Sequence, residues 1–219
     1  MRGKMIPEDD AREWLARGIV ARKSGRYADA LASLEKAAEI DPSLAGAWRN
    51  LSIVLNELDR LDEALKCSDR AISIEPENAR SWIARGFTLH NMGLYQRAVE
   101  SYARAIELNP SGPDARRAWN NRGAALDNLE RHHEAIESYD QAIAIDPFDN
   151  YAWNNKGVAL SSLSDHDEAL MCFEKAIEID PLYTTAWMNR GGSLKALGRE
   201  EEAEESILRG EELDDPSFS

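Results

Sequence analysis

The sequence predicts an all-α solenoid built from six helix-turn-helix repeats, and three observations support this fold class. The six tryptophans, which are all that the chain contains, recur at intervals of 34, 34, 37, 34 and 34 residues. A fixed period of this length is typical of repeat architectures. Small residues recur in the same register, and the alternating pattern of strands is absent. The tryptophans are Trp14, Trp48, Trp82, Trp119, Trp153 and Trp187.

The spacing within one repeat predicts two helices that pack closely together. When the tryptophan is numbered as position 4, position 8 is glycine in five repeats and Ser52 in the second, and position 20 is alanine in all six. Positions 4, 8 and 11 share one helical face, and positions 20, 24 and 27 share another. Small residues at positions 8 and 20 let the helices approach, and larger residues at positions 4, 11 and 24 fill the core. We therefore expect each tryptophan to be a buried core residue.

Turns and proline mark the ends of these helices. Segments such as Ser24-Gly25-Arg26 and Met92-Gly93-Leu94 separate the two helices of a repeat. Proline at position 32 closes five repeats, because proline cannot continue a helix. The predicted organisation is an N-terminal segment, 1–10, and one array, 11–217, with repeats at 11–44, 45–78, 79–112, 116–149, 150–183 and 184–217.

Three extra residues lie between the third and fourth predicted repeats, at 113–115. We expect them to lengthen a surface loop. A hinge between two halves of three repeats is the alternative.

The recurring Trp, Gly, Ala, aromatic, Ala and Pro positions resemble the tetratricopeptide repeat family. The resemblance covers nearly the whole chain. It departs from the family pattern at Ser52 and Ser68, where Gly and an aromatic residue are usual, and at position 7, which is Arg or Lys in five repeats. The resemblance implies a right-handed superhelix whose first helices line the concave side.

Composition excludes several classes of protein. The net charge of −14, with 26 basic against 40 acidic residues, argues against a general nucleic-acid binder, and nucleic-acid binding through a basic groove is kept only as a third, less favoured alternative. No apolar run approaches the ~20 residues of a membrane helix, and the charged first ten residues lack the apolar core of a signal peptide. We therefore expect a cytoplasmic protein that does not bind membranes. Cys67 and Cys172 share one position in different repeats, so we expect them to be buried and unbonded.

No motif indicates catalysis, a metal or a cofactor. The four histidines are not at metal-ligand spacing with cysteine or acidic partners. A glycine-rich phosphate loop and a nucleophile elbow are both absent from the sequence. We therefore predict a non-enzymatic protein without a cofactor.

Charge is distributed unevenly along each repeat. Positions 1–14 of the six repeats hold 13 basic and 3 acidic residues, a net +10, so the rest of the chain carries −24. We expect the position 7 cations to form ion pairs with the second helix, for example with Glu134 or Glu168. Seven of the eight remaining cations are predicted to line the groove: Arg12, Arg22, Lys23, Arg49, Arg80, Arg117 and Lys195.

Asparagine recurs in the middle of the first helices, where it is a poor helix former. Position 6 is Asn50, Asn121, Asn155 and Asn189, and position 5 adds Asn120 and Asn154. An amide offers both a donor and an acceptor, which suits the backbone of an extended peptide. The row formed by Asn121, Asn155 and Asn189 resembles the asparagine ladder that grips peptide backbone in the repeats of protein O-GlcNAc transferases. Hydrogen bonds between neighbouring repeats are the alternative role.

The predicted function is a scaffold that binds an extended or helical peptide segment of a partner protein in a concave groove, with a preference for acidic stretches. Leu15, Ile19, Ile53, Ile83, Phe87, Tyr151 and Met188 are apolar groove residues that either pack between repeats or receive ligand side chains. The alternative is a homo-oligomer that assembles through the ends of the array or through the groove. The predicted ligand-binding residues are Arg49, Asn50, Arg80, Arg117, Asn120, Asn121, Tyr151, Asn154, Asn155 and Asn189.

Overall fold

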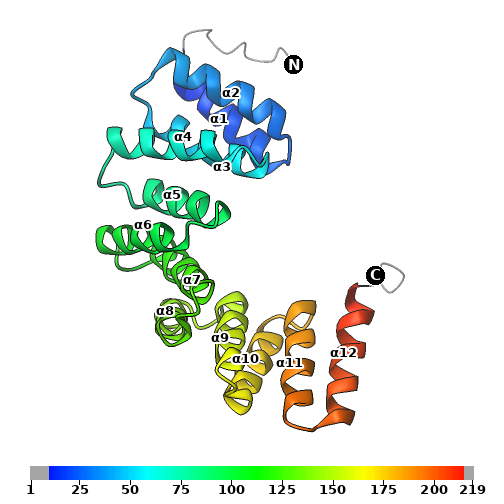
Figure 1. Ribbon diagram of the computed structural model, residues 1–219. Helices are drawn as coiled ribbons and strands as arrows, with labels where there is room; N and C mark the ends of the chain where they lie inside the picture. The colour runs from blue at the N-terminus through cyan, green and yellow to red at the C-terminus, as the bar shows by residue number, and fades with distance from the viewer. Residues whose placement is uncertain (1–9, 215–219) are drawn as a thin grey trace. The chain divides into compact units, whose positions relative to one another are not determined.

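A computed structural model describes residues 10–214, which form twelve α-helices (Figure 1). Their bounds are Ala11–Lys23 (α1), Tyr27–Ile40 (α2), Ala45–Glu57 (α3), Leu61–Ile74 (α4), Ala79–Asn91 (α5), Tyr95–Leu108 (α6), Pro113–Asp127 (α7), His132–Ile145 (α8), Asn150–Ser162 (α9), His166–Ile179 (α10), Thr184–Ala196 (α11) and Glu200–Asp214 (α12). The predicted all-α fold of paired helices is confirmed. The expectations for residues 1–9 and 215–217 lie outside the described residues.

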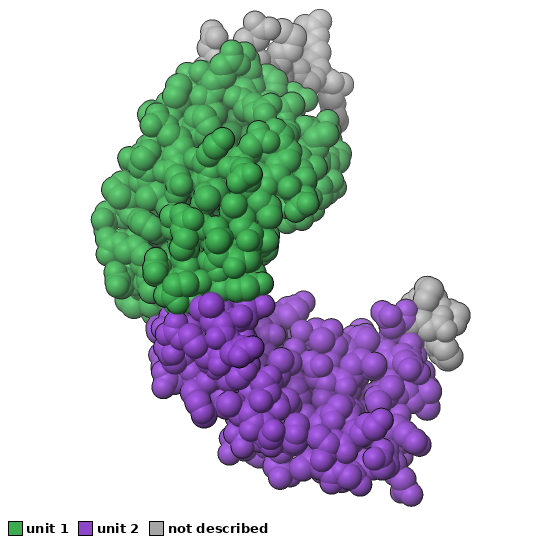
Figure 2. Space-filling view, viewed as in Figure 1, with its two compact units in different colours: residues 1–110 green, residues 111–219 purple. Residues whose placement is uncertain are grey.

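The chain divides into two compact units, residues 1–110 and 111–219, coloured green and purple in Figure 2. The first contains the pairs α1/α2, α3/α4 and α5/α6, and the second contains α7/α8, α9/α10 and α11/α12. In each unit the odd-numbered first helices of neighbouring repeats contact one another. Within the described range, the second helices contact only first helices. Each unit therefore has a continuous layer of first helices.

Glycine at position 8 allows the two helices of a repeat to touch. A Cβ atom built on Gly157 would lie 2.5 Å from the ring of Phe173, and one on Gly123 would lie 2.5 Å from the ring of Tyr139. Real Cβ atoms do not come this close to a ring, so any larger residue would force the helices apart. The predicted small-residue contact is therefore present.

The second repeat departs from this rule at both ends of the same contact. Ser52 at position 8 and Ser68 at position 24 are both fully buried. In the other repeats the residue at position 24 is the one that a Cβ atom at position 8 would meet, for example Tyr102, Tyr139 and Phe173. A serine at position 24 is smaller than these residues, which is consistent with a side chain larger than glycine at position 8.

The tryptophans are half-buried, which is less than the predicted burial, and Trp14, Trp48 and Trp153 pack against the core clusters as expected. The indole Nε1 of Trp153 donates to the carbonyl of Pro147 at 3.0 Å. Trp48, Trp82 and Trp187 make the same bond to the proline six residues earlier. This bond keeps one edge of each indole near the surface. It also joins position 4 of one repeat to the closing proline of the repeat before it.

Three of the position 7 cations form ion pairs across the boundary between repeats. Lys156 Nζ lies 2.7 Å from Asp140 Oδ1, Arg190 lies 3.3 Å from Glu174 Oε1, and Arg85 lies 2.7 Å from Asp69 Oδ1. Their partners are on second helices, as expected, but at position 25 of the preceding repeat, so Glu134 and Glu168 were the wrong examples. Arg122 instead donates to Ser138 Oγ of its own repeat, and Arg131 forms the ion pair with Glu134, at 2.6 Å. These three pairs hold neighbouring repeats together.

The three extra residues form helix and do not lengthen a loop. Pro113, Asp114 and Ala115 are the first turn of α7, and they follow Gly112, which has φ 91°. Proline is favoured at the first position of a helix because its missing N–H would have no partner there. The predicted surface loop was wrong at these residues, and the hinge remains a prediction.

Candidate functional site

The candidate site is the face of the first helices that positions 2, 5, 6, 9 and 12 form in each unit, here called the first-helix face. In the second unit its asparagines are joined across repeat boundaries. Asn155 Nδ2 donates to Asn120 Oδ1 at 3.2 Å, and Asn189 Nδ2 donates to Asn154 Oδ1 at 2.9 Å. Position 6 of one repeat thus bonds to position 5 of the repeat before it. The alternative role, bonding between repeats, holds for these four residues.

These bonds leave part of each exposed amide available. An amide has two N–H donors and an oxygen with two lone pairs. Asn155 and Asn189 each use one donor, and no described residue donates to either amide oxygen. Asn121, at the start of the same row, is half-exposed and makes no side-chain hydrogen bond to any described residue. The row therefore offers both donors and acceptors to a ligand.

Two of the predicted ligand-binding asparagines are packing residues. Asn50 is 5% exposed, and its Nδ2 donates to the carbonyl of Gly46 at 2.8 Å. Asn154 is 3% exposed and supplies the oxygen that Asn189 binds. Burial leaves neither side chain accessible to a ligand. The prediction is corrected for these two residues.

The other predicted residues lie at or near the surface of their own unit. In the first unit Arg49 is half-buried and Arg80 is exposed. In the second unit Arg117 is exposed, and Tyr151 is 58% exposed with its ring centroid 5.2 Å from that of Tyr183. These residues remain candidates for contact with a partner.

Arg116, next to Arg117, has a structural role instead. It forms ion pairs with Asp149 and Asp146. The Asp149 side chain is almost fully buried and also caps α9 by accepting from the amides of Tyr151 and Ala152. A guanidinium that neutralises a buried carboxylate is not available to a ligand.

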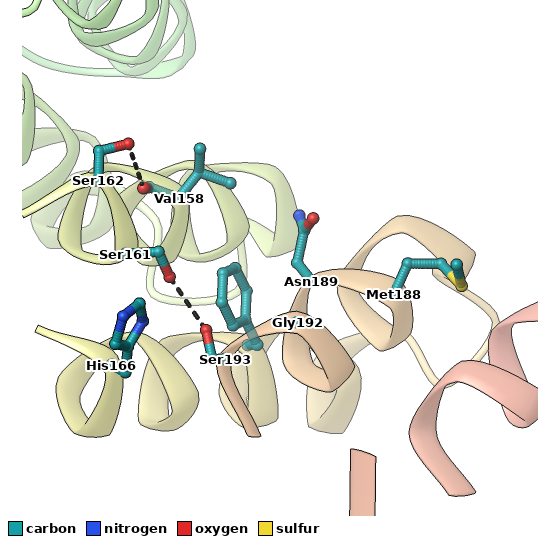
Figure 3. A pocket seen from close by; sticks show the side chains of 9 residues that line it. Val158, Ser161, Ser162, His166, Met188, Asn189, Gly192 and Ser193 are labelled. Atoms are coloured by element: carbon teal, nitrogen blue, oxygen red, sulfur yellow. Dashed lines mark hydrogen bonds between the residues drawn. The ribbon is translucent and has the colours of Figure 1, made fainter. Parts of the chain in front are cut away.

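A pocket of about 360 Å³ opens on the first-helix face between the fifth and sixth repeats (Figure 3). Its apolar walls come from Val158, Phe173 and Met188. Its polar lining comes from Ser161, Ser162, His166, Asn189 and Ser193. Gly192 also lines it, and a Cβ atom built there would meet nothing within 4 Å.

Sequence reasoning named only Asn189 and Met188 among the residues of this pocket. Gly192 could have indicated the pocket, because it is at position 9, where four of the other repeats carry a larger apolar residue: Ile19, Ile53, Phe87 and Val158. A missing side chain at that position leaves an open space. The closeness of Val158 and Gly192 depends on how two repeats stack, which the period alone does not reveal.

The fourth repeat fills the equivalent place with its own side chains. Tyr139 donates its hydroxyl to Asp127 Oδ2 at 2.7 Å, and His132 Nδ1 lies 3.0 Å from Asp127 Oδ1. Burial raises the pKa of Asp127 and that of Tyr139. Phenol, imidazole and carboxylate thus satisfy one another, and no open position is left among them.

Two kinds of site are absent from residues 10–214. No cluster of three or more His, Cys, Asp or Glu side chains is placed to hold a metal ion there. None of the twelve described helices is long and apolar enough to cross a membrane.

Sequence comparison identifies one family along the chain. Models of the tetratricopeptide repeat match residues 11–44, 50–120, 117–149, 151–183 and 184–216. No curated protein matches the chain.

Several solved structures are similar in fold. PilW, described as a widely conserved type IV pilus biogenesis factor, is 20% identical with a TM-score of 0.84 over 90% of each chain. PilF of Pseudomonas aeruginosa is 20% identical with a TM-score of 0.79, over 92% of this chain and 91% of its own. YrrB, described as a TPR protein with an unusual peptide-binding site, is 22% identical with a TM-score of 0.63, over 84% of this chain and 94% of its own. At these identities the likeness shows the fold alone.

Proposed function

This chain belongs to the tetratricopeptide repeat family, and from that premise we propose that it is a non-enzymatic scaffold that binds a peptide segment of a partner protein on its first-helix face. The family supports an interaction scaffold, and the peptide-binding site named for YrrB shows that this fold can hold a peptide. The surface chemistry of the first helices argues for the same role here.

The main support for the proposal is the row of asparagine side chains in the second unit, because their amide groups still have donors and acceptors that no described residue bonds. Asn121 has no side-chain partner among the described residues, and the oxygens of Asn155 and Asn189 remain available. A peptide backbone presents one donor and one acceptor at each residue. Amides on successive repeats can satisfy both without preferring a particular side chain. Tyr151, more than half exposed, adds an apolar surface with a polar tip.

Charge supports an acidic partner segment. In the second unit the exposed Arg117 lies on the first helix α7, and in the first unit the exposed Arg80 lies on the first helix α5, while the chain as a whole carries −14. Opposite charges on a partner accelerate encounter and favour one orientation of the bound segment. Because these cations are exposed, added salt should weaken the attraction.

The test uses peptides selected for binding to the pure protein from a random 12-residue library. We expect Asn121→Ala to weaken selected peptides about tenfold, which corresponds to the ~1.4 kcal/mol of one well-formed polar contact. Gln141→Ala is the matched control, because it removes an exposed amide from the second helix of the same repeat. Peptides that bind both variants as tightly as the original protein would refute the first-helix face as the site.

Self-assembly through the last helix is a second candidate, because α12 exposes apolar surface. Leu208 is 57% exposed and lies beside Ile207 in a shallow hollow rimmed by four glutamates. Two copies of this hollow would place like charges opposite each other, which disfavours a symmetric pair. Light scattering over a concentration series tests this candidate, and a monomer at every concentration removes it. Association that Leu208→Glu abolishes would support it.

A further inference from the structure

The pocket in the fifth repeat lies where the fourth repeat holds a complete hydrogen-bonded group. Position 17 is histidine in both repeats, but position 12 changes from Asp127 to Ser161 and position 24 changes from Tyr139 to Phe173. The fifth repeat therefore lacks both the carboxylate and the phenolic hydroxyl of its neighbour. The imidazole of His166 remains without either of them.

The loss leaves a buried polar atom unsatisfied. His166 Nδ1 is buried and has no hydrogen-bond partner among the described residues. Ser161 does not replace the carboxylate: its Oγ lies 3.0 Å from Ser193 Oγ and bonds to it (Figure 3), and it makes no hydrogen bond to His166 Nδ1. Buried polar groups in native proteins nearly always have a partner, so the unpaired nitrogen marks the hydrogen bonding around His166 as incomplete. Because this nitrogen is buried, a ligand atom in the pocket bonds to it only when the imidazole ring turns toward the pocket.

The polar lining can both donate and accept. Ser161 and Ser193 share one hydrogen bond, which leaves one of their two hydroxyl hydrogens to donate. Asn189 keeps its amide oxygen as an acceptor, since only its Nδ2 is used by Asn154. His166 Nδ1 donates or accepts according to its tautomer. A hydroxyl on the ligand would match this combination.

The remaining lining favours a neutral, apolar body. Val158 and Met188 are each 40% exposed, and Phe173, which is 1% exposed, also lines the pocket. No aspartate, glutamate, lysine or arginine is among the described residues that line the pocket. A charged ligand tip would thus be desolvated without a counter-charge. The volume of about 360 Å³ falls within the range of roughly 300–1,000 Å³ typical of small-ligand sites.

We propose that this pocket accepts the phenol ring of a tyrosine carried by the bound peptide segment. The ring lies against the apolar walls, and its hydroxyl bonds to the polar group formed by Ser161, His166 and Ser193. The inference rests on the proposed function, because it names one side chain that the first-helix face recognises. In this pocket the partner supplies the hydroxyl that Tyr139 supplies within the fourth repeat.

The test uses p-cresol, which is the tyrosine side chain as a free molecule, and follows amide signals of the whole protein by NMR. We expect saturable shifts at Gly192 and Ser193. Toluene, which lacks the hydroxyl, should bind about fivefold more weakly, the effect of a hydrogen bond worth ~1 kcal/mol. Acetate and propionamide should bind more weakly than p-cresol. The equivalent place in the fourth repeat, which the side chains of Asp127 and Tyr139 fill, is the internal control. The amide signals of Asp127 and Tyr139 should not move.

Two variants test whether p-cresol binds in this pocket. Gly192→Leu should abolish the shifts, because a side chain at this open position projects into the pocket. Phe173→Tyr restores a hydroxyl from within the protein and should weaken p-cresol at least fivefold without filling the pocket. Circular dichroism establishes that each variant is folded. The second variant keeps the test decisive if the first one does not fold.

Binding of p-cresol that is unchanged in Phe173→Tyr would overturn the inference, as would equal binding of toluene, tighter binding of acetate or propionamide, or no saturation. The assay contains no peptide, so its failure leaves the proposed peptide face untouched. Conversely, selected peptides that ignore Asn121→Ala would refute the proposed function even if p-cresol binds in the pocket.

Discussion

Asn189 in the sixth repeat donates a hydrogen bond of 2.9 Å to Asn154 in the fifth, and Asn154 is almost completely buried. Asn155 makes the equivalent bond to Asn120, which is half-exposed. Replacing different asparagines of this row should therefore lower the free energy of unfolding by different amounts. This difference separates their structural contribution from any contribution to binding.

We predict that alanine at these positions destabilises the protein in a graded order. Asn189→Ala leaves a buried oxygen without a donor and should cost about 1–3 kcal/mol. Asn155→Ala should cost less, about 0.5–1 kcal/mol, because water can reach Asn120. Asn121→Ala breaks no hydrogen bond and should be neutral or gain a few tenths of a kcal/mol from helix propensity. Urea unfolding measures the three values, and equal values would contradict the observed bonds.

The indole bond predicts a difference between two tryptophans. Trp153→Phe keeps most of the ring but loses the bond to Pro147. Trp119 follows the three-residue insertion and makes no such bond to a described residue, so Trp119→Phe is the matched control. Both carry a cation over the ring, Lys156 at 5.9 Å and Arg122 at 5.5 Å. Trp153→Phe should cost about 0.5–1 kcal/mol more in thermal or urea unfolding. Indistinguishable stabilities would argue against the indole bond.

Two glycines in the second unit should respond oppositely to alanine. At Gly157 the added methyl group meets the buried ring of Phe173, and overpacking of this kind costs about 1–3 kcal/mol. At Gly192 the methyl group meets nothing, so the helix propensity of alanine should stabilise the protein by about 0.5–1 kcal/mol. Unfolding midpoints that shift in the same direction would contradict the close helix contact at position 8.

Both cysteine thiols should be unreactive in the folded protein. Burial raises the pKa of Cys67 and of Cys172 to about 11. At pH 8 roughly one thiol in a thousand is then ionised, against about a quarter at the unperturbed pKa of ~8.5. Labelling with a chromogenic disulfide should therefore be at least ~100-fold slower in the native state than in urea, and it should accelerate as pH rises. Cys67→Ser and Cys172→Ser assign the signal, and equal native and denatured rates would disprove the burial.

The sequence was sufficient to predict the helix pairs, because the residues that define them lie within one repeat. Gly157 and Phe173, sixteen positions apart, meet because two helices of known period must pack. The depth of Trp153, the partner of Lys156 and the pocket beside Gly192 were not predicted. Each depends on the offset between stacked repeats, which sets whether a side chain meets its own second helix or that of the repeat before it. A periodic sequence is compatible with several such offsets.

The proposed function requires that the first helices of the second unit hold the partner segment. NMR tests this by following which backbone amide signals move when the tightest selected peptide is added to the isotope-labelled protein. We expect saturable shifts along α7, α9 and α11, including Asn121, Tyr151 and Gly192, and none along the exposed sides of α8 and α10. Shifts concentrated on α8, α10 or α12 would contradict it.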